Sequence, residues 1–292
     1  MSFTGLSPRQ ASAGVGLRRP HYSEFLNEKQ PIAWLEIHAE NFLNFETPAY
    51  KILERLRQDY PISFHAVNLS IGSSDGIDED HVKRVKALIE RINPFLVSDH
   101  LSWGRIDGYY LNDLLPIPYT QEALTLFTSN LSRIQDILER PLLIENPSSY
   151  LQFQVSEMTE AEFLGALVHR TGAGVLLDIN NIYVSCCNHG WDAQQYLKAI
   201  PAGKVKEMHL SGHTIRGPLR IDDHGSQVCP EVWDLYQKGI NRFGPVPTLI
   251  EWDNNVPNLT TLLNEASKAQ TILDSVRVPS NTTRKERHVR FG

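Results

Sequence analysis

Imidazole and carboxylate side chains recur at the ends of apolar, β-rich stretches of this sequence. VKEMHLSGH, at residues 205–213, begins like a half-buried strand and ends with two histidines four residues apart. Ionisable groups gathered at an apolar centre repel one another and lose hydration unless something compensates their charge, and metal cations compensate it best. The same combination surrounds five further residues: His65 in FHAVNLS, His100 in VSDHLSW, Glu145 in LIENPSSY, Asp178 in LLDINNIY and Glu251 in LIEWDNN.

The residue types restrict the metal. Imidazole and carboxylate without thiolate suit zinc, iron or manganese, whereas calcium and magnesium sites would not use so many histidines. The three cysteines, Cys186, Cys187 and Cys229, form neither an even framework nor a CxxC spacing, so structural disulfides and thiolate zinc sites are not indicated. Taken singly, each candidate has an ordinary explanation, because buried histidines are commonly hydrogen-bonded core residues and strand-end aspartates cap helices.

The elements that must position these residues alternate between β-rich and helical stretches, eight of each. Apolar residues recur at three and four positions in the helical stretches, and several β-rich stretches are continuously apolar, as in parallel strands covered on both faces. Eight such units favour a closed (β/α)8 barrel, a TIM barrel of the α/β class, over an open doubly wound sheet. The predicted strands are 14–18, 33–42, 62–70, 95–103, 141–150, 174–183, 205–213 and 248–253, and helices are predicted at 50–60, 79–92, 122–140, 161–172 and 258–276.

In such a barrel the carboxyl ends of the strands and the loops after them converge on one mouth. The connection 213–229 is too long for a simple turn, and we expect it to bring Asp222 and His224 to that mouth. Glu36, His38 and Glu40 share one face of the second strand and are expected either to support the site by hydrogen bonds or to serve simple polar packing. The candidates exceed the needs of one ion, which leaves room for two or three.

The composition is that of a globular protein, with 292 residues, 41% hydrophobic and 21% charged. The net charge of -6 argues against duplex nucleic acid as a partner, and neither a membrane span nor a signal peptide is indicated, so we expect a cytoplasmic protein. One barrel domain is predicted over 1–275. The basic tail at 276–292, which contains RKERHVRFG, is either a solvated end or a docking arm for an acidic partner.

Taken together and in order, the stretches GVGLR, WLEIHAENF, FHAVNLSIG, VSDHLSW, LIENPSSY, DINNIYVS, EMHLSGH and IEWD resemble the multinuclear non-heme iron-dependent oxidative enzymes. This family was long uncharacterised and includes iron enzymes of methanobactin and thiaglutamate biosynthesis. The resemblance covers residues 14–255 and implies a xylose-isomerase-like barrel with two or three iron ions in mixed Fe(II)/Fe(III) states. It also implies nine metal ligands: His65, His100, Glu145, Asp178, Asn181, His209, Asp222, His224 and Glu251.

The resemblance further implies an activity. Characterised members use dioxygen to oxidise a cysteine of a ribosomally made precursor peptide, and many act with a small partner protein that presents the leader of that peptide. The product differs among relatives: an oxazolone with a thioamide, a heterocycle, or excision of the β-carbon. The residues alone leave two alternatives, a zinc or manganese barrel that isomerises or epimerises sugars or hydrolyses phosphodiesters, and a non-catalytic barrel that retains the ligands.

Overall fold

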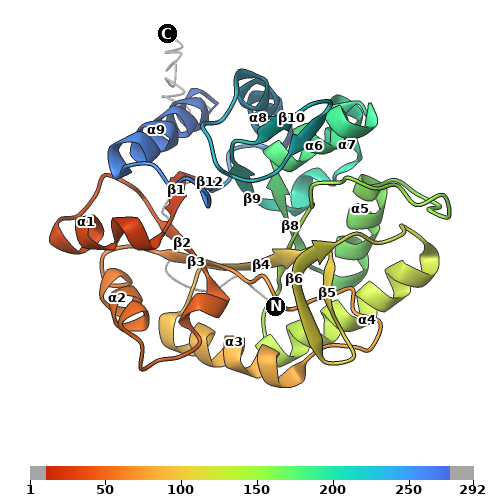
Figure 1. Ribbon diagram of the computed structural model, residues 1–292, viewed down its shortest axis with the longest axis horizontal. Helices are drawn as coiled ribbons and strands as arrows, with labels where there is room; N and C mark the ends of the chain where they lie inside the picture. Colours follow the sequence, from red (N-terminus) through yellow and green to blue (C-terminus); the bar gives the residue numbers. More distant parts are fainter. Residues whose placement is uncertain (1–10, 277–292) are drawn as a thin grey trace, which may run out of the picture.

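Eight parallel strands close into a barrel in the computed structural model, which describes residues 11–276. The predicted (β/α)8 barrel is therefore confirmed, and Figure 1 shows the helices placed around the strands. Apart from its first residue, the predicted basic tail lies outside the described residues. Around the barrel the strands follow the order β1 (Ala13–Gly16), β12 (Thr248–Ile250), β9 (Val205–Leu210), β8 (Gly174–Asp178), β7 (Leu143–Glu145), β4 (Leu96–His100), β3 (Ile62–His65) and β2 (Leu35–His38).

The strands lie where the sequence predicts them, but they are shorter. The stretch predicted as a strand over 174–183 is a strand only as far as Asp178, and α6 (Ile179–His189) begins at the next residue. The physical reason is a cap: one carboxylate oxygen of Asp178 accepts a hydrogen bond of 2.6 Å from the backbone N–H of Asn181. The remaining apolar residues of the stretch therefore belong to a helix.

The helices were predicted more closely than the strand ends. The predicted helix 79–92 coincides with α3 (Glu79–Ile92), whose N-terminus is capped by the Asp78 side chain. The described chain also contains α1 (Tyr22–Asn27), α2 (Pro48–Leu56), α4 (Gln121–Leu138), α5 (Glu160–Thr171), α7 (Ala193–Ala199), α8 (Pro230–Phe243), α9 (Leu259–Ser275), and the 3-10 turns η1 (Arg19–His21), η2 (Ala39–Phe42) and η3 (Ala202–Lys204).

Apolar side chains form two separate cores. The larger core joins the outer face of the strands to the helices and includes Val15, Ile37 and Phe64. The smaller core closes the barrel interior near the amino ends of the strands and consists of Trp34, Phe95, Leu96, Leu143, Leu176 and Leu249. Gly14 makes room for the Trp34 ring, since a Cβ at this position would stand 2.4 Å from it. Above this core the barrel interior is polar, with the fully buried side chains of Glu36, Ser63 and Glu207.

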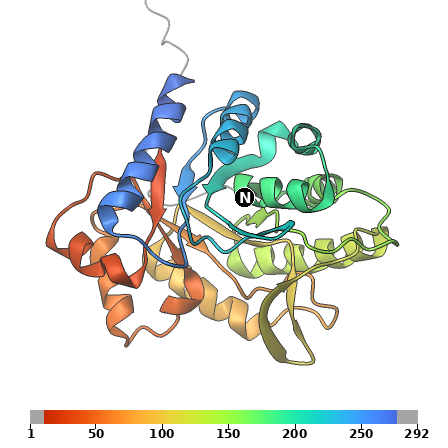
Figure 2. The ribbon, with the colours of Figure 1, turned by 45° about the horizontal axis from the view of Figure 1, so that its top comes forward.

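Two antiparallel hairpins interrupt the alternation and were not predicted. β5 (Trp103–Ile106) pairs with β6 (Tyr109–Leu115) after β4, and β10 (Thr214–Arg216) pairs with β11 (Leu219–Ile221) after β9. Figure 2 shows the first of them, in olive, extending away from the barrel. Within residues 11–276, no helix combines the length and the apolar character needed to cross a bilayer.

Candidate metal centre

Inward-facing side chains at the carboxyl ends of the strands meet at one opening. Because successive side chains alternate across a strand, every second residue of a barrel strand points inward. His65 and Glu145 are the last residues of β3 and β7, and His209 stands one residue before the end of β9. A cavity of about 400 Å³ lies over them and is also lined by Asp222 and His224 of the connection 213–229. The connection therefore brings Asp222 and His224 to the mouth, as predicted.

One cluster joins β3, β4 and β7. The Nε2 atoms of His65 and His100 are 3.1 Å apart, and they lie 3.2 and 3.4 Å from Oε2 of Glu145. Donor atoms that bind one ion at about 2.0–2.2 Å, with angles of about 90–110° between the bonds, stand about 2.8–3.6 Å apart. The three edges of this triangle fall in that range, so the three atoms can share one ion.

A hydrogen bond with Ser98 fixes the tautomer of His65. Its Nδ1 lies 2.8 Å from Oγ of Ser98, and this hydroxyl donates its own proton to the backbone carbonyl of Phe64. Nδ1 must therefore carry the imidazole proton, which leaves the lone pair on Nε2, the atom that faces Glu145. Burial, and then the neighbouring His100, hold the pKa of His65 well below its usual value. A neutral imidazole with an inward lone pair is the form that binds a metal.

A second cluster is formed by Glu145, Asp178, His209 and Glu251, and all four residues are buried. Nδ1 of His209 is 3.0 Å from Oε2 of Glu251 and 3.9 Å from Oε1 of Glu145. Asp178 caps α6 with one oxygen, while its Oδ2 is buried and has no hydrogen-bond partner within the described chain. The helix cap and the metal ligand are therefore compatible roles of the same side chain. Glu145 belongs to both clusters and can bridge two ions.

The carboxylates of Glu36 and Glu207 lie on the inner side of His209. Nε2 of His209 is 3.3 Å from Glu36, and all three side chains are fully buried. A metal-bound histidine commonly donates its second N–H to a carboxylate, which fixes the orientation of its ring. Glu207 was missed in the sequence, although it has the same parity as His209 in β9 and must point to the same side. These three residues also form a candidate metal cluster of their own.

A third group lies nearer to solvent. Nε2 of His224 is 2.8 Å from Asp222, and Nδ1 of His224 is 3.3 Å from Asp253 and 3.4 Å from Glu251. Asn181, predicted as a ligand, lines the same cavity, but its Oδ1 accepts a hydrogen bond of 2.9 Å from Ser148. The first two clusters, of three and four residues, thus bring together six of the nine predicted ligands, and Asn181, Asp222 and His224 stand beside them in one cavity.

A cationic side chain at the rim was also missed in the sequence. Arg18 donates a hydrogen bond of 2.6 Å from Nε to Asp253, and its Nη2 lies 3.0 Å from Nε2 of His38. His38 is in turn 3.5 Å from Glu251, so His38 and Asp253 join a further candidate cluster with that residue. The stretch GVGLR carried Arg18 as a sequence signal, but only the closed barrel places β1 next to β12.

Several neighbouring polar residues have supporting roles. Glu40 accepts hydrogen bonds of 3.1 Å from the backbone N–H groups of Val67 and Asn68, so it supports the loop after β3. His213, the second histidine of VKEMHLSGH, bonds Asn180 at 2.9 Å and belongs to none of the candidate clusters. Of the three residues expected either to support the site or to serve polar packing, Glu36 and His38 therefore contact the centre, and Glu40 does not.

Burial and neighbouring charges shift the pKa values of the residues in the centre in different directions. Desolvation raises the pKa of Glu145 well above its usual value and that of Asp178 to about 7. Desolvation also opposes the charge on Glu251, but His224 and His209 hold its pKa well below its usual value. Burial likewise disfavours protonated His209, yet the Glu36 and Glu251 carboxylates raise its pKa well above its usual value. Protons thus replace part of the positive charge that cations would supply.

Unpartnered donor atoms test whether metal ions fit this centre. In the described chain, buried atoms without a hydrogen-bond partner include Oε2 of Glu145, Oδ2 of Asp178 and Nε2 of His224. Such orphaned groups are rare in native proteins and call for a ligand. The donors are nitrogen and oxygen, and their spacing suits ions that take imidazole and carboxylate. The residues therefore fit a centre with several metal ions.

Comparisons with known proteins show to which family the chain is related. The family model described as "RiPP precursor modification enzyme MbnB/TglH/ChrH" matches residues 12–274, where RiPP denotes a ribosomally synthesised, post-translationally modified peptide. A UPF0276 protein of Vibrio parahaemolyticus is 49% identical over 276 residues, which cover 93% of this chain and 96% of the relative. A UPF0276 protein of Caulobacter vibrioides is 45% identical over 258 residues, covering 88% and 92%.

Solved structures with the same fold include L-ribulose 3-epimerase, with a TM-score of 0.61 and 14% identity, covering 91% of this chain and 96% of the other. IolI protein with a bound zinc atom has a TM-score of 0.56 and 14% identity, covering 91% and 99%. At this identity the likeness extends to the barrel and no further. The family match spans nearly the whole described barrel, and the chain belongs to the MbnB/TglH/ChrH family of RiPP precursor modification enzymes.

Proposed function

We propose that this protein is a cytoplasmic oxidase that uses iron and dioxygen to modify a cysteine of a ribosomally synthesised precursor peptide. The observation that carries the proposal is the set of buried nitrogen and oxygen clusters that share Glu145 and Glu251. Their donors include no protein thiolate, so a cysteine sulfur of the substrate would not compete with one for the metal. The family match supplies the precursor peptide as the substrate class.

The proposed ligands divide among two or three ions. His65, His100 and Glu145 would hold one iron, and Glu145 would bridge to a second held by Asp178, His209 and Glu251. Asn181, Asp222 and His224 would hold a third. Bound iron supplies one-electron redox chemistry and open positions for dioxygen and a thiolate.

The chain itself orients the donors and excludes bulk water. Ser98 holds His65 with its lone pair inward, and the Glu36 carboxylate, 3.3 Å from Nε2 of His209, would orient that ring. Arg18 balances Asp253 at the rim. Because these supports are themselves buried or half-buried, the donor atoms keep their positions before substrate arrives, which is what preorganisation requires.

The mouth offers a surface for an extended peptide. Both hairpins border the cavity, since Leu114 of β6 and Asp222, directly after β11, line it. Each hairpin exposes a large hydrophobic side chain: Tyr109 is 74% exposed and Ile215 is 61% exposed. Peptides commonly bind by pairing with exposed strands while side chains enter pockets. We therefore propose that the hairpins guide the precursor, and that a small partner protein presents its leader.

Metal analysis and dioxygen consumption test the proposal. Protein produced with ample iron and purified without oxygen should contain two to three iron ions per chain, with Mössbauer and EPR signals of coupled Fe(II) and Fe(III). Dioxygen uptake should require a cysteine-containing precursor peptide and should stop when that cysteine is replaced by serine. About one equivalent of zinc or manganese without iron would instead favour the sugar-isomerase or phosphodiesterase alternative. Equal turnover of both peptides would exclude thiolate binding.

A further inference from the structure

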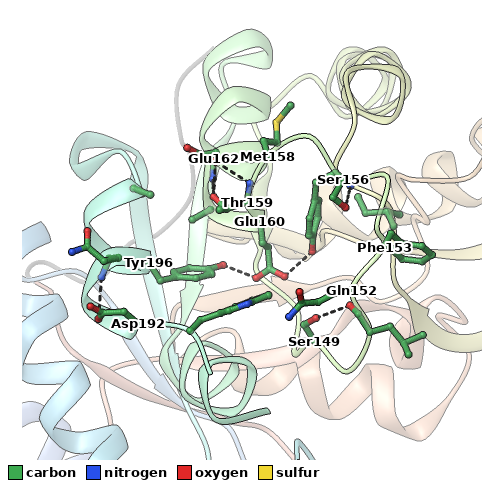
Figure 3. A pocket seen from close by; sticks show the side chains of 17 residues that line it. Ser149, Gln152, Phe153, Ser156, Met158, Thr159, Glu160, Glu162, Asp192 and Tyr196 are labelled. Atoms are coloured by element: carbon green, nitrogen blue, oxygen red, sulfur yellow. Dashed lines mark hydrogen bonds between the residues drawn. The ribbon is translucent and has the colours of Figure 1, made fainter. Parts of the chain in front are cut away.

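A second cavity lies on the other side of the loop that leaves β7. It has a volume of about 610 Å³, within the range of roughly 300–1,000 Å³ that is common for ligand pockets. Its walls come from this loop and the starts of α5 and α7, and they include the aromatic rings of Tyr119, Phe153, Trp191 and Tyr196. Figure 3 shows the cavity with its lining side chains. None of these residues belongs to the metal clusters of the described chain.

A single carboxylate lies deep in this cavity. Glu160, the first residue of α5, is 2% exposed. Its Oε2 accepts a hydrogen bond of 2.6 Å from the hydroxyl of Tyr119, and its Oε1 accepts one of 2.6 Å from Tyr196. Figure 3 shows the Tyr196 hydroxyl pointing at this carboxylate. Within the described residues Glu160 forms no ion pair, so its charge is met only by neutral donors.

The helix terminus does not account for Glu160. The first turn of α5 is already closed by a capping box, in which Thr159 and Glu162 satisfy each other's backbone N–H groups. The Glu160 side chain instead turns toward the two tyrosines. Burial raises its pKa to about 7, and the hydrogen bonds from the two tyrosines offset this only in part.

We propose that this cavity binds the guanidinium or ammonium group of a basic side chain. Aromatic faces attract cations within about 6 Å of the ring centre, and a carboxylate paired with a cation forms a stronger hydrogen bond than one paired with a neutral donor. The long apolar stem of arginine or lysine matches the apolar part of the wall, which includes Ile117 and Met158. An uncharged apolar ligand would leave the carboxylate uncompensated.

The position of the cavity identifies the source of the cation. Ser148 lines the metal cavity, and its neighbour Ser149 lines the second cavity, so one loop segment separates the two. Leu151 of the same loop is 63% exposed at the entrance. A peptide whose cysteine reaches the metal centre can therefore place a nearby arginine or lysine in the second cavity. This choice of ligand rests on the proposed function, whereas cation binding itself does not.

Calorimetric titration of the full-length, metal-free chain tests cation binding without iron or dioxygen. The probes are Nα-acetyl-arginine N-methylamide and the matching citrulline compound, which has the same shape without the charge. The arginine probe should bind at least about tenfold more tightly than the citrulline probe. Glu160→Gln should abolish this preference. Glu157→Gln should keep it, because that substitution removes the same charge nearby from an exposed side chain that does not line the cavity.

Three outcomes would overturn the proposal. The first is equal binding of the two probes by the unchanged protein, and the second is an unchanged arginine preference in Glu160→Gln. The third is tight binding of agmatine without binding of the capped arginine, which would assign the cavity to a free small amine. Should Glu160→Gln fail to fold, Trp191→Leu removes a wall without touching the carboxylate and should weaken the arginine complex about threefold to tenfold. An unchanged affinity in that variant would also exclude binding of the cation between the aromatic walls of the cavity.

Discussion

The metal centre and the second cavity solve the same electrostatic problem in different ways. Each contains a buried carboxyl group whose pKa is raised to about 7 by desolvation, Asp178 in the centre and Glu160 in the cavity. Around Asp178 lie further carboxylates and imidazoles, and its Oδ2 has no partner within the described chain. Around Glu160 two tyrosine hydroxyls occupy both oxygens.

The difference shows what each site requires. Neutral hydroxyl donors satisfy the hydrogen bonds of one isolated carboxyl group, which can keep its proton or accept one organic cation. They cannot neutralise several carboxylates whose oxygen atoms lie within 4.8 Å of one another, because the mutual repulsion remains. Only multivalent cations meet that demand with few atoms. Exchanging the same acid for its amide at both sites should therefore have unequal consequences.

Glu145→Gln should have the largest effect. Glu145 belongs to two clusters, and an amide offers neither the charge nor the second anionic oxygen needed to bridge two ions. We expect iron affinity to fall more than about 100-fold, beyond the usual effect of losing a residue that merely supports a ligand. Iron content after anaerobic loading measures this, with Glu160→Gln as the matched control. Full iron occupancy in Glu145→Gln would contradict the assigned ligand set.

Glu160→Gln should instead change how stability depends on pH. The pKa of about 7 in the folded protein exceeds the ordinary glutamate pKa of 4.5. The protonated form is therefore favoured by folding, and that stability is complete below about pH 4.5 and is lost as the pH rises through about 7. Relative to the variant, the metal-free protein should lose up to about 3 kcal/mol of unfolding free energy between pH 4.5 and 8. Parallel pH profiles in urea unfolding would show that Glu160 is not desolvated.

Glu36 and Glu207 allow a comparison inside the centre. Both are fully buried, but of the two only Glu36 lies within ion-pair distance of His209, 3.3 Å from its Nε2. Burial and the neighbouring Glu36 raise the pKa of Glu207 well above its usual value, which favours the protonated form that glutamine resembles. Glu36→Gln should weaken iron binding about 10- to 100-fold, whereas Glu207→Gln should change it less than about threefold. Equal losses would show that the pair acts as one unit.

The sequence predicted the barrel because its signals are local and repeated. Apolar runs and helical periodicity placed the eight strands, and the convergence of strand ends then assembled the His65 and Glu145 region without any contact information. Strand ends were predicted too long because stretches such as DINNIY are apolar enough for a strand, while the cap by Asp178 converts them to helix. The first hairpin had a sequence signal that was not used, the dipeptide Asp107–Gly108, which is typical of tight hairpin turns. Both residues have positive φ in the structure.

The second cavity had no comparable signal. Glu160 meets Tyr119 and Tyr196 from positions 41 and 36 residues away, and no motif or periodicity links the three. Arg18 was similarly hidden, because its partner Asp253 lies 235 positions along the chain. Contacts of this kind arise from closure of the barrel and from the packing of loops. They become visible only when the fold is known.

The smallest expected effect concerns the tautomer of His65. Ser98→Ala removes the hydroxyl that accepts the Nδ1 proton, which costs about 0.5–1.5 kcal/mol for a neutral hydrogen bond, or up to about tenfold in iron affinity. Ser63→Ala is the matched control, because Ser63 is also fully buried in the barrel but bonds Glu207 instead. Only Ser98→Ala should alter the spectroscopic signature of the iron bound by His65. If both serine variants bound iron like the unchanged protein, with the same Mössbauer parameters, His65 would be held by packing alone.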